Sequence, residues 1–282
     1  MNSNFFIKKT AFKEDTLDFF SLIIDVRSPT EFNLDSIPTS INLPVLTDNE
    51  RDQVGKIYKK NKFQARIIGA KFVLKNINKI IRKKVLDKRK KVLIYCWRGG
   101  QRSLSLYLIL KSIGFEVEIL NEGYKGYRGF INNFFNIGIN KYNFNILSGL
   151  TGSGKTYFLE KLSIHKPVLN LEKLANHKGS ILGEIPNIAQ PSQKKFETKI
   201  WFNLLKYNSN KKIWAESESN RIGKLFIPNN LYKKLTVGKI LNLFIDTDVR
   251  ANFILKDYKY LVTQTKYLGE ALNILKKFIK KN

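Results

Sequence analysis

The segment GLTGSGKT at 149–156 is the first pattern with a clear chemical use. It matches G-x-x-x-x-G-K-[ST], a phosphate-binding loop that stands between a strand and a helix. Its glycines let backbone N–H groups turn toward an anion, Lys155 reaches terminal phosphates, and Thr156 is placed to hold Mg²⁺. The loop therefore predicts a site for a diphosphate or triphosphate, with no nucleotide specified. The residues expected to contact it are Gly149, Gly152, Gly154, Lys155 and Thr156.

A carboxylate that follows another apolar strand usually completes such a site. Two are available: Glu216 after the apolar run 213–215, and Asp246 after the apolar run 241–245. We prefer Glu216, because further polar and charged residues gather behind it at 218–221. Either acid could instead simply end a strand at the surface.

The second chemical centre is the segment YCWRGGQRS at 95–103, which holds the single cysteine, Cys96. The cysteine ends a strand-like run, and a helix is expected to begin near Ser103. Loop N–H groups and a helix N-terminus favour the thiolate, which is the nucleophilic form. Arginines in the loop suit an oxyanion donor. The residues expected to form this oxyanion loop are Arg98, Gly99, Gly100 and Arg102. A buried structural cysteine is the alternative, which this density of arginine and glycine disfavours.

The spacing Cys-x5-Arg also describes a phosphatase loop, but such enzymes need a general acid near the thiolate, and none is identified. The upstream stretch DVRSPTEF at 25–32 instead resembles the rhodanese signature. In rhodanese-like domains, loop amides cradle a cysteine that carries transferred sulfur or selenium. Asp25 is expected to stabilise a strand end by hydrogen bonds rather than to take part in the chemistry.

The elements that must position these loops follow from the apolar pattern. In the first half, strand-like runs at 21–26, 91–95 and 117–120 flank a helix-like pattern over 63–85. After an expected linker at 131–143, strand-like runs recur at 144–147, 168–171, 212–215 and 240–245. This alternation predicts an α/β protein with parallel sheets. We assign a rhodanese-like domain to residues 1–135 and a P-loop NTPase-like domain to residues 140–282.

Composition agrees with two globular domains. The chain has 282 residues, 43% hydrophobic and 26% charged, and one domain usually takes ~100–200 residues. One cysteine excludes an intrachain disulfide and a CxxC zinc site. No apolar run approaches the ~18–20 residues that span a bilayer, and the N-terminus lacks a signal-peptide pattern, so we expect a cytoplasmic protein without a membrane partner. The net charge of +27 fits a nucleic-acid partner, although an AT-rich coding sequence would also enrich lysine.

Taken together, the motifs resemble those of the bacterial tRNA 2-selenouridine synthase family. The similarity runs in order from about residue 20 to residue 260. Besides the two loops above, the matching segments are NLPVLTDNERDQVGKIYKK at 42–60, NEGYKGYRGF at 121–130, LEKLANHKGS at 171–180, QPSQKKFE at 190–197 and ESESNRIG at 216–223.

This resemblance implies a transferase that acts on tRNA carrying a 2-thiouridine wobble base. In the family, geranyl diphosphate first S-geranylates the base, and selenium from selenophosphate then replaces the geranylthio group. Cys96 matches the family's catalytic cysteine. The phosphate-binding loop would hold a diphosphate without nucleotide hydrolysis, so the resemblance implies substrates and Mg²⁺ rather than a tightly bound cofactor. Family members extend beyond the KKFIKKN end of this chain, so we expect a shortened P-loop domain.

Further site residues follow from the resemblance. His177 and Glu216 are expected near the diphosphate or its Mg²⁺, although His177 could equally be a structural hydrogen-bonding residue. A mixed aromatic and basic cluster suits an anticodon loop, whose splayed bases stack on aromatic or arginine side chains; a surface helix start would look the same. The residues of this cluster are Tyr124, Lys125, Tyr127 and Arg128.

Two hypotheses from other functional classes remain open. The first is a simple rhodanese-type sulfurtransferase with a regulatory nucleotide-binding P-loop domain. The second is a non-catalytic RNA-binding protein, which the intact Cys96 and Lys155 disfavour.

Overall fold

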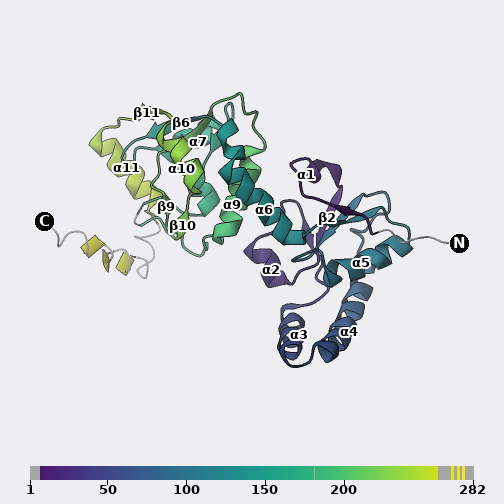
Figure 1. The fold of residues 1–282 in the computed structure, drawn as a ribbon. Helices are drawn as coiled ribbons and strands as arrows, with labels where there is room; N and C mark the ends of the chain where they lie inside the picture. Colours follow the sequence, from purple (N-terminus) through teal and green to yellow (C-terminus); the bar gives the residue numbers. More distant parts are fainter. Residues whose placement is uncertain (1–6, 181, 260–267, 270–271, 274, 277–282) are drawn as a thin grey trace. The chain divides into compact units, whose positions relative to one another are not determined.

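The computed structural model describes residues 7–180, 182–259, 268–269, 272–273 and 275–276. The chain divides into two compact units, residues 1–132 and 133–282, each with its own parallel sheet (Figure 1). Both units are α/β, as the alternation of strand-like and helix-like segments predicts. Among the described residues, no helix combines the length and the apolar character needed to cross a bilayer.

The first unit is built on a five-stranded parallel sheet with the strand order β1-β5-β4-β2-β3. Every residue of β2, β4 and β5 is buried, which explains why these strands are mostly apolar rather than alternating; the acid inside β5, Glu118, pairs with Lys8 (2.8 Å). The strands are β1 (Lys9–Thr10), β2 (Leu22–Asp25), β3 (Ile41–Asn42), β4 (Val92–Tyr95) and β5 (Val117–Leu120).

Six helices accompany this sheet in the sequence: α1 (Thr16–Phe19), α2 (Pro29–Leu34), α3 (Asp48–Lys60), α4 (Lys62–Ile81), α5 (Gln101–Ser112) and α6 (Gly123–Asn136). Helices α3 and α4 lie side by side (Figure 1). Thr47 and Glu50 form a capping box at the start of α3, and the Asn61 side chain accepts the Gln64 N–H at the start of α4. The helix expected over 63–85 is therefore α4, which ends earlier, at Ile81.

The second unit has a four-stranded parallel sheet with the order β11-β6-β8-β7, and a short antiparallel pair, β9 and β10. The strands are β6 (Phe144–Ser148), β7 (Val168–Leu169), β8 (Ile213–Glu216), β9 (Arg221–Ile222), β10 (Leu225–Phe226) and β11 (Lys239–Asn242). The helices are η1 (Gly138–Lys141), α7 (Lys155–Leu162), α8 (Leu171–Ala175), α9 (Gln193–Leu204), α10 (Asn229–Thr236) and α11 (Thr247–Asp257).

The segment 131–143, expected as a linker, contains the boundary between the two units, but its structure is helical rather than irregular. Helix α6 continues to Asn136 and the 3₁₀ helix η1 follows. Phe134, Ile139 and Tyr142 are buried, and the Tyr142 hydroxyl donates to the Leu204 carbonyl (3.2 Å). The asparagines that made the segment look polar alternate with apolar residues at helical spacing, so the apolar face packs inward.

Candidate functional site

Cys96 follows directly on β4 at the carboxyl end of the first sheet, where ligand sites of parallel sheets usually lie. Its side chain is 3% exposed. The Gly100 N–H donates to Cys96 Sγ (3.2 Å), and the Ser103 hydroxyl lies 3.3 Å from the sulfur. Helix α5 begins immediately after Gly100. A backbone donor and a helix N-terminus thus lie beside the sulfur, the arrangement that suits a bound oxyanion.

The start of α6 holds this loop in place. The Tyr124 N–H donates to the Cys96 carbonyl (2.8 Å), and the Lys125 N–H donates to the Trp97 carbonyl (3.0 Å). Gly123 has φ +56°, and a Cβ there would lie 2.3 Å from the Cys96 carbonyl oxygen. Only glycine combines this close approach with a left-handed backbone. The first turn of α6 is therefore a structural support of the cysteine loop.

The two loop arginines differ in their surroundings. Arg102 donates to Glu31 (2.7 Å), which also pairs with Arg51 (3.2 Å). Burial of Glu31 opposes its charge, but the hydrogen bond from Arg102 outweighs that and holds the pKa of the carboxyl below its usual range. Arg98 is exposed. Of the two, Arg98 is thus the one with its charge open to an incoming oxyanion.

A buried polar network lies behind the cysteine loop. Arg27 and Asp25 form an ion pair at 2.6 Å, with both side chains at 1% exposure or less. Although burial opposes its charged form, the hydrogen bonds to Asp25 raise the pKa of Arg27. The Arg27 guanidinium also stacks 3.9 Å from the centre of the Tyr124 ring. Asp25 thus has the structural role that the sequence predicted for it.

The burial of this network corrects the expectation for tRNA contact. Tyr124 donates from its hydroxyl to Asp35 (2.8 Å), and Arg128 pairs with the same carboxylate (3.4 Å). Tyr124, Tyr127 and Arg128 are 3%, 0% and 9% exposed, so they are not available to stack on a base. They are buried because they form the inward face of α6. Lys125 alone of the four is exposed.

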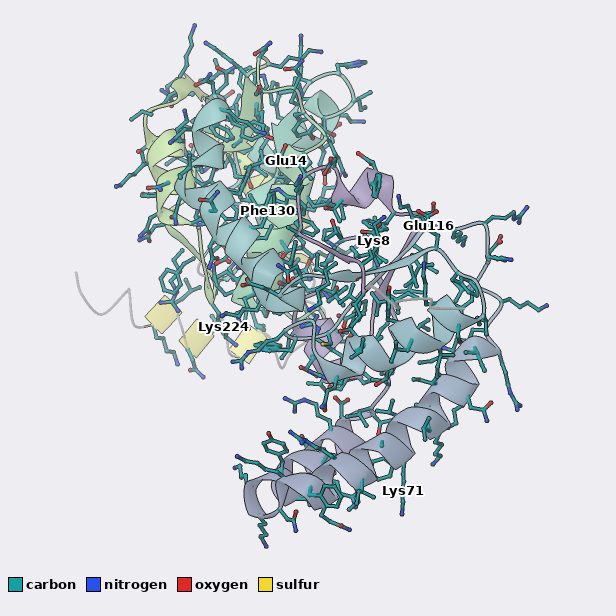
Figure 2. The ribbon with its side chains drawn as sticks, turned by 45° about the vertical axis from the view of Figure 1, so that its right-hand side comes forward. Lys8, Glu14, Lys71, Glu116, Phe130 and Lys224 are labelled. Atoms are coloured by element: carbon teal, nitrogen blue, oxygen red, sulfur yellow. The ribbon has the colours of Figure 1, made fainter. Side chains whose placement is uncertain are left out.

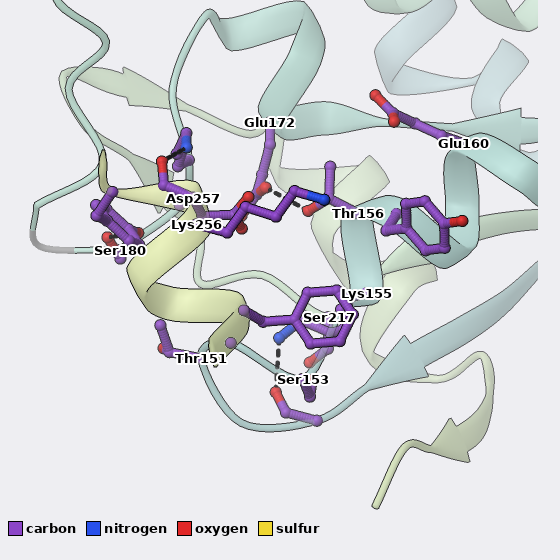
Figure 3. Close-up of a pocket in the computed structure, with 18 of the residues that line it drawn as sticks. Thr151, Ser153, Lys155, Thr156, Glu160, Glu172, Ser180, Ser217, Lys256 and Asp257 are labelled. Atoms are coloured by element: carbon purple, nitrogen blue, oxygen red, sulfur yellow. Dashed lines mark hydrogen bonds between the residues drawn. The ribbon is translucent and has the colours of Figure 1, made fainter. Parts of the chain in front are cut away.

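The phosphate-binding loop joins β6 to α7 in the second unit. Gly152 and Gly154 have φ +80° and +75°, values that turn successive N–H groups inward. The loop borders a cavity of about 500 Å³ (Figure 3). The residues that line it include Gly149, Gly152, Gly154, Lys155, Thr156, Tyr157, Glu172, Lys178, Gly179, Ser180, Ser217, Glu218, Phe253, Lys256 and Tyr258. All five residues predicted for the diphosphate border this cavity.

The polar groups of the loop already have partners. Lys155 Nζ donates to the carbonyls of Gly149 (2.7 Å) and Leu150 (3.2 Å). The Thr156 hydroxyl donates to Glu172 (3.0 Å), as Figure 3 shows. A diphosphate in the cavity would compete with the two carbonyls for the ammonium group.

Three carboxyl groups lie behind and beside the loop. Glu216 ends β8 and is 3% exposed; one of its oxygens accepts the Glu172 N–H (2.8 Å), and the other has no hydrogen-bond partner. Burial raises the pKa of Glu216 to about 7. Burial, together with the nearby charges of Glu172 and Glu216, raises the pKa of Glu218 to about 8. Burial likewise raises the pKa of Glu172.

Of these acids, Glu172 and Glu218 border the cavity, whereas the predicted Glu216 lies behind them. Asp246, the alternative acid, is exposed at the start of α11. Thr156, Glu172 and Glu218 offer the oxygen donors that Mg²⁺ prefers, and the unpartnered oxygen of Glu216 stands behind them. These residues fit a divalent cation beside a diphosphate. Within the described ranges, however, no group of three His, Cys, Asp or Glu side chains is arranged to hold a metal by itself.

His177 does not border the cavity. It is 4% exposed, and its Nδ1 accepts the Gly179 N–H (3.1 Å). A Cβ at Gly183 or Gly223 would approach the imidazole ring to 2.8 or 2.7 Å. The imidazole therefore packs against glycine backbone on two sides, which is the structural role left open for it, while the residues that follow it, Lys178–Ser180, border the cavity.

Helix α11 covers the phosphate-binding loop, a feature that the sequence motifs did not predict. Phe253 lies beside Gly154, and a Cβ at Gly152 would meet the Ile254 side chain at 2.4 Å. Lys178 Nζ bonds to the Asp257 carbonyl, and the Tyr258 hydroxyl lies 2.6 Å from the hydroxyl of Ser180. Aromatic side chains from α11 and the following residue thus stand beside the loop amides.

Comparison with known proteins finds a family model that covers each of the two sites. A rhodanese-like domain model matches residues 9–129, and the model of the tRNA 2-selenouridine synthase AAA domain matches residues 142–277. A tRNA 2-selenouridine synthase of Shewanella sediminis is 35% identical over 260 residues, which cover 89% of this chain and 69% of that protein. The chain belongs to the tRNA 2-selenouridine synthase family.

Other members of the tRNA 2-selenouridine synthase family show the same level of similarity. The protein of Nitrosomonas europaea is 33% identical over 84% of this chain, and that of Shewanella oneidensis is 34% identical over 86%. The chain spans 63% and 65% of the length of these two relatives. The cysteine loop falls in the rhodanese-like match, and the cavity beside the phosphate-binding loop falls in the AAA-domain match.

Proposed function

We propose that the protein converts 2-thiouridine at the wobble position of tRNA to 2-selenouridine through an S-geranylated intermediate, using geranyl diphosphate and selenophosphate in the cytoplasm. The observation that carries the proposal is the presence, in one chain of this family, of two sites with different chemistry. One is a buried cysteine sulfur that accepts the N–H of Gly100 in its loop. The other is a phosphate-binding loop beside aromatic side chains.

The first step belongs to the phosphate-binding loop. The sulfur of 2-thiouridine attacks C1 of the geranyl group, a C–S bond forms, the C–O bond to diphosphate breaks, and the base loses its N3 proton. The loop amides and Lys155 would hold the diphosphate that leaves. Thr156 and Glu172 are the residues that would hold Mg²⁺, whose charge stabilises the leaving diphosphate. Tyr157 and Phe253, whose rings lie 6.5 Å apart, would cover the hydrocarbon of the donor.

The second step belongs to the cysteine loop. A C–Se bond forms at C2 of the base, the C–S bond breaks, and the alkylated sulfur takes a proton and leaves as geranylthiol. The phosphorus–selenium bond of selenophosphate breaks, and water supplies the oxygen of the phosphate released, so the exchange needs no oxidant. An alkylated sulfur leaves far more readily than a bare thiocarbonyl, which is the reason for the first step. The Cys96 loop and Arg98 would hold the selenium donor.

Nucleoside mass spectrometry tests the proposal. A tRNA carrying 2-thiouridine is incubated with the protein, geranyl diphosphate and selenophosphate, and each donor is also omitted in turn. We expect S-geranyl-2-thiouridine with the first donor alone and 2-selenouridine only with both. Cys96→Ser should retain the first product and lose the second, whereas Lys155→Ala should lose the first.

Two results would contradict the proposal. Loss of S-geranyl-2-thiouridine in Cys96→Ser, or failure of Lys155→Ala to selenate a tRNA that already carries S-geranyl-2-thiouridine, would contradict the assignment of one step to each site. An unchanged nucleoside, together with turnover of thiosulfate and cyanide, would indicate a simple sulfurtransferase.

A further inference from the structure

A large, mainly apolar groove has no part in the two sites above. It lies in the first unit between α3, α4 and α5, and its volume is about 1180 Å³. Sites for small organic molecules usually have ~300–1,000 Å³, so the groove has room for a hydrocarbon chain together with part of a base. Its walls are aliphatic: Val54, Ala70, Val73, Leu74, Leu104 and Leu108.

Part of this aliphatic wall is open to solvent. Leu74 is 63% exposed and Leu108 is 42% exposed, and they come from different helices, α4 and α5. Contiguous exposed apolar surface of this kind on a soluble unit marks a binding surface. Tyr58 is the one aromatic residue among those that line the groove, which favours a flexible aliphatic occupant over stacked bases.

The rim of the groove is basic. Arg51, Lys56, Lys59 and Arg66 border it, against the single acid Asp52. The basic character continues along α4 outside the groove, where Lys71 projects from the helix (Figure 2). An aliphatic wall with a positive rim is complementary to an amphiphile, a hydrocarbon chain attached to a polyanion.

The groove also reaches the cysteine loop. Gln101 and Arg102, the first residues of α5, border the groove. They follow directly on Gly100, whose N–H donates to Cys96 Sγ. Arg102 and Arg51 both pair with Glu31, so one ion-pair network joins the cysteine loop to α3. A molecule whose reacting atom is at the loop could extend its substituent into the groove.

We propose that this groove binds the hydrocarbon chain of the S-alkylated base while the cysteine loop acts on C2 of that base. The inference rests on the proposed function, since it concerns the intermediate between the two steps. The basic rim would contact the phosphates that flank the modified nucleotide. The groove gives the second step a preference for alkylated over free 2-thiouridine, and it holds the leaving group in line with its departure from C2.

Binding of an anticodon stem–loop by the full chain tests this assignment. The probe carries S-geranyl-2-thiouridine or, as the reference, 2-thiouridine, and fluorescence anisotropy gives the two dissociation constants. Both probes have the same phosphates, so their ratio isolates the contribution of the hydrocarbon. Burial of even part of the chain predicts a preference of at least about tenfold for the alkylated probe.

Two variants alter the groove by different means. Leu74→Asp places a charge on its wall, and Ala70→Trp fills it; both positions are exposed, so the fold should be retained, which circular dichroism checks. The matched control is Phe63→Asp, because Phe63 is 72% exposed on the same helix and does not border the groove. We expect both groove variants to remove the preference and the control to keep it.

Absence of a preference in the unaltered protein, or its survival in both groove variants, would overturn the proposal. The proposal would also be overturned if the protein is a dimer that Leu74→Asp dissociates without changing the preference for the alkylated probe. The groove would then be an interface between two copies of the chain. The nucleoside assay separates this failure from that of the function. If 2-selenouridine forms but the groove variants keep the preference for the alkylated probe, only the proposal for the groove is refuted. If the groove variants remove that preference but no modified nucleoside forms, only the two-step function is refuted.

Discussion

The buried carboxyl group of Glu216 makes the stability of the protein depend on pH. Its pKa in the folded chain is about 7, against an ordinary value of 4.5, because the group is buried. The folded protein therefore keeps a proton that the unfolded chain releases above its ordinary pKa. The stabilisation is fully present below about pH 4.5 and is lost as the pH rises through about 7. Each pH unit between the two values is worth about 1.4 kcal/mol, so the total loss is about 3 kcal/mol.

The perturbation is Glu216→Gln. The amide oxygen of glutamine can still accept the Glu172 N–H, which Glu216 now accepts at 2.8 Å. The amide nitrogen takes the place of the second oxygen of Glu216, which has no hydrogen-bond partner. The free-energy cost of burying this nitrogen without a partner is the same at every pH. Removal of the Glu216 charge also lessens the repulsion that contributes to the raised pKa of Glu218. The variant should therefore show a shallower fall of stability with pH than the unaltered protein.

The measurement is the free energy of unfolding by denaturant at about pH 5 and about pH 8, without donor substrates and with a chelator. We expect the unaltered protein to lose about 2–3 kcal/mol more than the variant over this interval. Equal slopes in the two proteins would refute the reasoning, because Glu216 would then titrate at its ordinary pKa. A larger loss in the variant would show that the sign is wrong.

Two other substitutions follow from the buried contacts. Gly123→Ala should destabilise the fold by at least about 2 kcal/mol, because of the left-handed backbone and the clash with the Cys96 carbonyl, and it should impair selenation more than geranylation. The control is Gly129→Ala, since a Cβ at Gly129 meets open space. Equal losses of stability in the two variants would contradict the argument. Arg27→Met leaves Asp25 buried without its partner and should lower the free energy of unfolding by about 3–5 kcal/mol. The exposed Arg89→Met should leave it unchanged in the same denaturant titration; similar values for the two arginines would contradict the role of burial.

The sequence predicts well those features that are local in the chain. A phosphate-binding loop needs a strand, a turn rich in glycine and a helix in succession, and all three lie within 144–162. The cysteine loop is equally local, since the Gly100 N–H that faces Cys96 is four residues away. Buried parallel strands read as mostly apolar runs, so the fold class also follows from the pattern.

Long-range partners are the part that the sequence does not predict. Tyr124 and Arg128 read as a surface cluster because nothing near them indicates Asp35, which binds both from about ninety residues away. Glu172 lies in the segment 171–180 that resembles the family, but nothing in that segment marks this acid as part of the phosphate site, and only the fold brings it to Thr156 and Glu216. The grooved surface between α3 and α5 likewise depends on tertiary packing. The composition of 131–143 indicates a connection between two domains, but it does not show that the connection is helical, because asparagine is common on the outward face of a helix.

The first turn of α6 supports the cysteine loop, and this determines which segments must be moved together to place the loop in another protein. A chimera in which only 95–103 replaces the loop of another rhodanese-like protein would carry the thiol, the arginines and the glycines. It would lack Gly123, the residue whose left-handed backbone and missing Cβ let the first turn of α6 come close enough for the Tyr124 and Lys125 N–H groups to bind the carbonyls of Cys96 and Trp97. The segment at 121–130 therefore has to be exchanged along with the loop. In any such chimera the two segments must be transferred together.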